Sequence, residues 1–284
     1  MELALEACTG WRYIAEELTA AGITPHLAEP AGTAFARGRK RHAKTGKTDS
    51  RHLRMLLAEG RLPGCWIPPA RILECRALLE LYNDLRAEHT AWIQRIHAVL
   101  FHQGAPVLGE GILRTERGLA ELRASAAVHL SPAGQVQVAT ALDILSALEA
   151  RLHAVRHQLL HAARHLADAK VLAARLYGAG PVTALAITCW LGGADRFSSS
   201  RKAVRFAGLD ITVSSDSKGR PGRLSRQGPP VLRWAVYEAG KTHARTSAPD
   251  HRYYAQVKDR KNGKRAALSE ARKILRQVRD LGRE

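Results

Sequence analysis

Apolar residues recur at alternating spacings of three and four over two long stretches in the middle of the chain. The first stretch has the two seams Cys75, Tyr82, His89, Ile96 and Leu78, Leu85, Trp92, Val99. The second stretch keeps the repeat for six heptads, with the seams Val138, Leu145, Leu152, Leu159, Leu166, Ala173 and Ala141, Leu148, Val155, Ala162, Ala169, Leu176. Sustained heptads are typical of coiled-coil helices. The second stretch therefore predicts one continuous helix of roughly 60 Å.

The segment between the two stretches can reverse the chain, because it contains Gly104, Pro106, Gly109, Gly111 and Pro132. We therefore expect an antiparallel helical hairpin over residues 70–175. His89 falls on a seam, and we interpret it as a tolerated polar core position rather than a ligand. The histidines of HAVRHQLLHAARH (153–165) could hold a metal, but we interpret them as the polar flank of the heptads.

Residues 1–69 have the pattern of a small α/β region. The apolar run LALEA (3–7) and the segment ITPHLAEP (23–30) predict two short strands, and WRYIAEELTAAG (11–22) between them predicts a helix. A basic loop follows, and then Thr48 is a candidate N-cap for a helix with apolar Leu53, Leu56 and Leu57. Strand, helix, strand, helix is the order of a parallel sheet.

Residues 176–284 are mostly helical in pattern, with one irregular stretch. The sequence LYGAGPVTALA (176–186) contains Gly178 and Gly180 just before Pro181, which is the pattern of a helix-hairpin-helix turn. Glycines there let backbone N–H groups approach a phosphate at a helix N-terminus. A segment rich in Ser, Gly and Arg follows (198–228), and the chain ends in a basic helical segment.

The net charge of the chain indicates what kind of partner it binds. The chain carries 44 Lys and Arg against 26 Asp and Glu, a formal net charge of +18. Residues 37–47 hold six basic side chains and no acid, and residues 256–284 hold ten basic and four acidic ones. Such an excess favours a polyanionic partner, and nucleic acid is the first candidate. No apolar run approaches the ~20 residues of a spanning helix, no secretory signal opens the chain, and the four cysteines lack metal-site spacing. We therefore expect a cytoplasmic, nucleoid-associated protein.

Several segments together resemble one family. They are LEACTGW, AKTGKTDSRHLRMLLAEGRLPGCWIPP, and the block from GAGPVTALA through RFAGLDITV to GRLSRQGPPVLRWAVYEAGKTHA. They are similar to the DEDD-type insertion-sequence transposases of the IS110 family. The resemblance implies α/β plus mostly α architecture in three parts. These are a partial RNase-H-like (RuvC-like) domain at 1–69, a coiled-coil hairpin at 70–175, and a C-terminal transposase domain at 176–284 with a serine loop.

The resemblance also implies DNA recombination guided by a structured bridge RNA, assembly as a homo-oligomer, and Mg²⁺ held by four carboxylates. Glu6 matches the family's Glu, and Asp49 matches the last Asp of its KTDxxD helix, so these two are the expected catalytic metal ligands. Gly46 stands where the preceding Asp should be, and the family's first Asp belongs to an earlier strand, so we expect a shortened reading frame.

The family's nucleophilic serine maps to TVSSDSKGRPGRLS, which offers Ser214, Ser215 and Ser217. Pairing with Asp216 and counting back from the downstream Pro-Gly favour Ser215. A serine–phosphate ester conserves bond energy, so a broken strand can be rejoined without external energy. We expect nucleic-acid contacts from the basic loop, the glycine turn and the arginines near the serines: Arg39, Lys40, Arg41, Lys44, Lys47, Gly178, Gly180, Arg201, Lys202, Arg223, Arg226 and Arg233. The alternative function is a remnant that binds nucleic acid without cleaving it.

Overall fold

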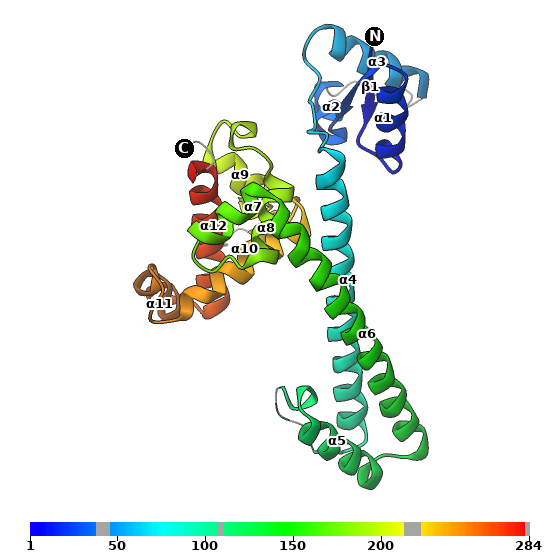
Figure 1. Cartoon of the computed structure of the whole chain (residues 1–284), viewed down its shortest axis with the longest axis vertical. Coiled ribbons are helices and arrows are strands. Elements are labelled where there is room, and N and C mark those ends of the chain that lie inside the picture. The colour runs from blue at the N-terminus through cyan, green and yellow to red at the C-terminus, as the bar shows by residue number, and fades with distance from the viewer. Residues whose placement is uncertain (38–45, 107–108, 110, 213–222, 282–284) are drawn as a thin grey trace, which may run out of the picture. The chain divides into compact units, whose positions relative to one another are not determined.

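The computed structural model of the chain (Figure 1) describes residues 1–37, 46–106, 109, 111–212 and 223–281. It divides into two compact units, Met1–Pro69 and Ala70–Glu284. Helices dominate, and the sheets are small, as the α/β plus mostly α pattern predicts. Among the described residues no helix is both long enough and apolar enough to span a membrane.

The first unit is built on two short parallel strands. Strand β1 (Glu2–Glu6) pairs with β2 (Thr24–Ala28), in a register that sets Glu6 beside Ala28. Helix α1 (Trp11–Ala20) connects them, α2 (Pro30–Arg37) follows β2, and α3 (Gly46–Ala58) follows α2. The core of this unit combines Leu27 and Ala28 of β2 with Leu53 and Leu56 of α3. The predicted basic loop after Pro30 is partly wrong, because Pro30–Arg37 is helical and buries Thr33.

The second unit begins with the expected helical hairpin. Helix α4 (Ala70–His102) and helix α6 (Pro132–His165) pack side by side, and α5 (Glu116–His129) lies near their connecting end, after the 3₁₀ turn η1 (Ile112–Arg114) (Figure 1). Their antiparallel direction follows from two separate cores. One core joins Ile96 and Leu100 to Val138 and Leu145, and the other joins Leu79 to Leu159.

The prediction of one unbroken helix over residues 138–176 is wrong. Helix α6 ends at His165, Leu166 has extended backbone angles (φ −107°, ψ 110°), and α7 runs over Ala167–Arg175. At 34 residues, α6 extends about 51 Å rather than roughly 60 Å. No glycine or proline marks the break. The reason is tertiary, because Leu172 and Leu176 are buried in the core that α8 shares with the upper part of the hairpin.

Helix α8 (Pro181–Leu191) is apolar on all sides and packs against α4, α6, α7 and α10 (Pro230–Lys241). Helix α12 (Gly263–Leu281) packs against α9 (Ser200–Phe206), α10 and α11 (His251–Arg260). The 3₁₀ turns η2 (Ala194–Arg196) and η3 (Thr242–Ala244) lie in the connections between these helices. A small antiparallel ladder of β3 (Ile211–Thr212) and β4 (Arg223–Leu224) closes the segment 213–222. This ladder positions the candidate site.

Candidate nucleic-acid interface

A cationic pocket lies at the base of the β3–β4 ladder. Its volume is about 800 Å³, and its walls come from β3, β4, α11, the turn after it, and α12. Five lining side chains are cationic, and none of the lining residues is acidic: Ile211, Arg223, Leu224, Arg226, Val257, Lys261, Arg265, Leu268, Ser269 and Arg272. A concave surface with this charge suits a phosphate group.

Backbone and side-chain contacts hold together the two strands of the ladder, which contribute to the pocket wall. Thr212 pairs with Arg223 in antiparallel register, and the Ser225 backbone N–H donates to the Asp210 carbonyl at 3.0 Å. The Ser225 hydroxyl also donates to the Asp210 carboxylate. Arg226 has a left-handed backbone (φ 54°), and its N–H donates to the Gly208 carbonyl at 3.1 Å. The residues that flank the serine segment (213–222) are therefore held together.

Arg233 and the pocket residue Arg272 also donate hydrogen bonds to the backbone of this region. Arg233 Nη1 donates to the Gly228 carbonyl at 2.9 Å and the Ala207 carbonyl at 3.2 Å, and Arg272 Nε donates to the Leu209 carbonyl at 2.8 Å. Burial lowers the pKa of both guanidinium groups, and the nearby charge of Arg226 lowers the pKa of Arg233 further. An anion in this pocket would relieve the repulsion among these cations.

The glycine turn contacts protein on one side and is open on the other. Gly178 has φ +82°, and a Cβ there would lie 2.2 Å from Thr242 Oγ1 and 2.7 Å from the Ala239 carbonyl. Gly180 is the N-cap of α8, and its Cβ position is free of neighbours. Beside this turn is a second pocket of about 500 Å³, to which Arg245 contributes. The close approach that requires a glycine at position 178 is thus to α10 and η3.

The predicted metal ligands lie in the first unit. Glu6 ends β1, and its Oε1 accepts a hydrogen bond from Thr33 Oγ1 at 3.1 Å. Asp49 is in the first turn of α3, and its Oδ1 lies 2.7 Å from Arg37 Nη2. Strand β1 and helix α3 are packed neighbours, but Gly46 offers no side chain. In the described part of this unit, no third ligand joins Glu6 and Asp49, so the donor set does not form a complete magnesium site.

The other predicted contacts are divided between exposed helices and residues outside the described ranges. Lys47 is exposed in the first turn of α3, and Arg201 and Lys202 are exposed in α9. The serines and most of the basic loop lie outside the described residues: Arg39, Lys40, Arg41, Lys44, Ser214, Ser215 and Ser217.

Three pocket cations were missed by sequence reasoning. Arg265 and Arg272 lie seven residues apart on α12, so they share one helix face, and Lys261 precedes that helix. The basic C-terminal run had been recognised only as a charge excess. Its helical spacing could have indicated which of its members face the β3–β4 ladder.

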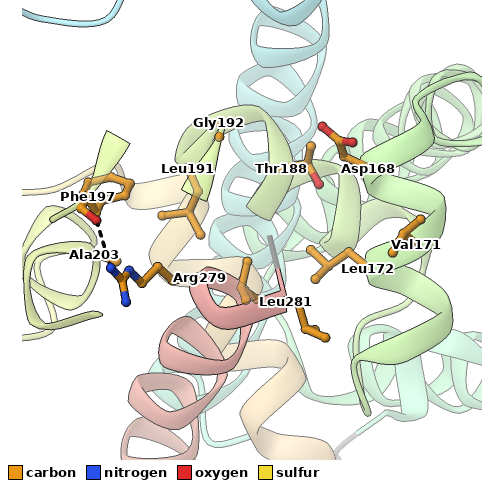
Figure 2. A pocket seen from close by; sticks show the side chains of 12 residues that line it. Asp168, Val171, Leu172, Thr188, Leu191, Gly192, Phe197, Ala203, Arg279 and Leu281 are labelled. Carbon is orange, nitrogen blue, oxygen red and sulfur yellow. Dashed lines mark hydrogen bonds between the residues drawn. The ribbon is translucent and has the colours of Figure 1, made fainter. Parts of the chain in front are cut away.

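An apolar pocket elsewhere in the second unit lacks these properties. Its volume is about 210 Å³, and mainly apolar residues of α7, α8, α9 and α12 line it (Figure 2). Arg279 lies at its edge, and the guanidinium donates to the Phe197 carbonyl at 3.4 Å. A phosphate would be poorly solvated there.

The fold and the cationic pocket define a mostly helical protein with a surface suited to nucleic acid. Residues 170–256 match the profile of the Transposase IS116/IS110/IS902 family. The chain is also similar to "Putative transposase y4rJ" of Sinorhizobium fredii, with 33% identity over 247 residues that cover 80% of this chain and 61% of that protein. "Probable family 20 transposase" of Pseudomonas aeruginosa is 26% identical over 255 residues, 87% of this chain and 72% of that protein.

The profile match and the two similar proteins together support an IS116/IS110/IS902-family transposase. The resemblance that the quoted segments carry is confirmed at the level of the family. The chain spans about 61% of the length of the first of these relatives.

Proposed function

We propose that this chain acts in transposition of an insertion sequence by cleaving and rejoining DNA strands. In this proposal the cationic pocket holds a phosphodiester and Ser215 attacks its phosphorus. The observation that carries the proposal is the pocket itself: five cations and no carboxylate at the point where the serine segment leaves and re-enters the described chain.

Chain connectivity supports a nucleophile from the segment 213–222, which contains Ser215. Ser215 follows Thr212 by three residues, and three residues span at most about 11 Å. Thr212 is paired with Arg223, which lines the pocket. A phosphate bound by the pocket would therefore lie within reach of the serine segment.

The chemistry needs little beyond positioning and charge. The Ser215 oxygen forms a bond to phosphorus as the bond from phosphorus to the sugar oxygen breaks, and the serine proton passes to the departing oxygen. The number of phosphate ester bonds is unchanged, so an incoming hydroxyl can reverse the step and join a new strand. Arg223, Arg226 and Arg265 would stabilise charge on the non-bridging oxygens.

The wider basic surface supports a long polyanion rather than a single phosphate. Arg201 and Lys202 are exposed on α9, and the basic run at 37–47 adds charge in the first unit. The resemblance names DNA and a structured guide RNA as partners, a homo-oligomer as the assembly, and Mg²⁺ as the cofactor through Glu6 and Asp49. These stay predictions, and no step above depends on the metal.

A second candidate function is binding without cleavage. The pairing of Asp49 with Arg37 and the glycine at position 46 favour it, because both remove carboxylate ligands that the family's metal chemistry uses. A Cβ at Gly46 would meet no atom within 4 Å, so the Gly46→Asp variant should fold.

Trapping covalent adducts tests the proposal. The full chain is incubated with end sequences of its element, Mg²⁺ and the candidate guide RNA, then denatured and resolved from free DNA. We expect a protein–DNA adduct that Ser215→Ala abolishes and that Ser214→Ala and Ser217→Ala retain. Adduct formation by Ser215→Ala at the wild-type level would overturn the assignment. Adducts that appear only with Gly46→Asp would instead identify the natural chain as a binding remnant.

A further inference from the structure

Three potential metal ligands lie close together among the C-terminal helices, and none of them lines the cationic pocket. They are His243 in η3, Asp250 at the start of α11, and Glu270 in α12. One ligand atom of each residue lies within 4.8 Å of the other two. Among the described residues this is the one such group of three.

The two buried members lack hydrogen bonds. His243 is 3% exposed and Glu270 is fully buried, yet neither ring nitrogen of His243 and neither carboxylate oxygen of Glu270 makes a hydrogen bond of normal geometry. Their remaining polar neighbours are the Tyr177 backbone for His243 and the Lys273 ammonium for Glu270. His243 Nδ1 and Glu270 Oε2 are 3.7 Å apart. Buried polar groups are normally satisfied, and leaving them unpaired is costly. Four such atoms at one point indicate a missing partner.

Lys273 supplies part of the positive charge but does not complete the site. Its Nζ lies 3.1 Å from Asp250 Oδ1 and 3.8 Å from Glu270 Oε1, beyond a hydrogen bond to the latter. It makes no hydrogen bond to the His243 ring, and its positive charge lowers the pKa of that imidazole. Lys273 is one-third exposed and lies 4.1 Å from the Tyr253 ring centroid, so it can leave toward that ring and solvent.

Asp250 is also available as a ligand. It stands at the N-cap position of α11, but its side chain makes no capping hydrogen bond. Its carboxylate is therefore oriented by the cluster rather than by the helix end. Burial raises the pKa of Glu270 to about 7 despite the opposing charge of Lys273, and burial also lowers the pKa of His243.

We propose that His243, Asp250 and Glu270 bind a divalent transition-metal ion, with zinc as the best match. One imidazole nitrogen and two carboxylate oxygens form a donor set that zinc accepts and that magnesium, which prefers oxygen, does not. Ligands about 2.0–2.1 Å from a tetrahedral zinc lie about 3.4 Å apart, close to the observed 3.7 Å. The ion would join η3, α11 and α12, and α12 also carries Arg265 and Arg272.

Surface histidines require a background variant for the test. His153, His157, His161 and His165 are spaced by four on the exposed face of α6, and the rings of His161 and His165 lie 4.5 Å apart. Residues at this spacing are neighbours on a helix and can chelate zinc on their own. The test therefore uses the full chain with all four replaced by Gln.

The experiment titrates chelator-stripped protein with Zn²⁺ and measures the heat of binding and the melting temperature of the protein. We expect one Zn²⁺ per chain and a raised melting temperature, with affinity reduced at least about tenfold in both Glu270→Gln and Asp250→Asn. Glu238→Gln, which removes a carboxylate paired with Lys241 elsewhere, should bind Zn²⁺ normally.

Lys273→Gln separates this proposal from a purely ionic cluster. If zinc displaces the ammonium, removing that charge should strengthen Zn²⁺ binding. Two results would overturn the proposal: no zinc bound by the histidine-substituted background, or unchanged affinity in both Glu270→Gln and Asp250→Asn. The second variant keeps the test valid if the buried Glu270→Gln change prevents folding, which circular dichroism reports.

Discussion

At the scale of single residues, glycines and arginines that suggest phosphate contacts also hold the protein together. Gly178 approaches α10 and η3, and the Arg233 guanidinium binds two backbone carbonyls. Sequence alone could select these residues as special, because glycine turns and arginines near serines are informative. It could not say what they touch, because Thr242, Ala207 and Gly228 approach them only through the tertiary fold.

Gly178→Ala should destabilise the protein by more than about 2 kcal/mol, since the left-handed backbone and the 2.2 Å approach to Thr242 Oγ1 both oppose a Cβ. Urea denaturation measures the change. Gly180→Ala is the matched control, because its φ of −71° and open surroundings accept a methyl group. Equal stability losses in the two variants would contradict this account of the turn.

At the scale of elements, the heptads predicted the hairpin because apolar periodicity is a local property. The antiparallel packing of α4 and α6 follows from it. The break at Leu166 could not be predicted, because the heptads continue through it and the competing contacts come from α8. The helix α2 was missed because it is only eight residues long, consists mostly of small residues, and runs directly into the basic segment that was interpreted as a loop.

The hairpin is expected to be anchored at its ends rather than along its middle. Leu159→Ala should cost about 2–5 kcal/mol, since Leu159 is fully buried in the core shared by α6 and the C-terminal helices. Leu152 lies one heptad earlier in α6 and is only half-buried, so Leu152→Ala should lower the free energy of unfolding by less. Chemical denaturation followed by circular dichroism compares them, and a larger loss for Leu152→Ala would contradict this distribution of the core.

At the scale of the whole molecule, the charge of +18 predicts a polyanionic partner, and the second unit concentrates five of its cations in one pocket. Composition could predict the class of partner but not which residues of the protein bind it. The pocket is assembled from the β3–β4 ladder, α11 and α12, segments that only the fold brings together. The carboxylates Glu6 and Asp49 were found by motif, but their contacts with Thr33 and Arg37 depend on α2, which the sequence did not predict.

The central claim is that this pocket binds the phosphate backbone. Fluorescence anisotropy of labelled DNA over a range of salt concentrations tests it most directly, with Arg265→Gln compared with Lys264→Gln. Both residues are exposed in the first turn of α12, and only Arg265 lines the pocket. We predict that Arg265→Gln weakens binding and lowers the salt slope by about one, while Lys264→Gln changes both much less. Equal effects of the two substitutions, or none from Arg265→Gln, would contradict the claim.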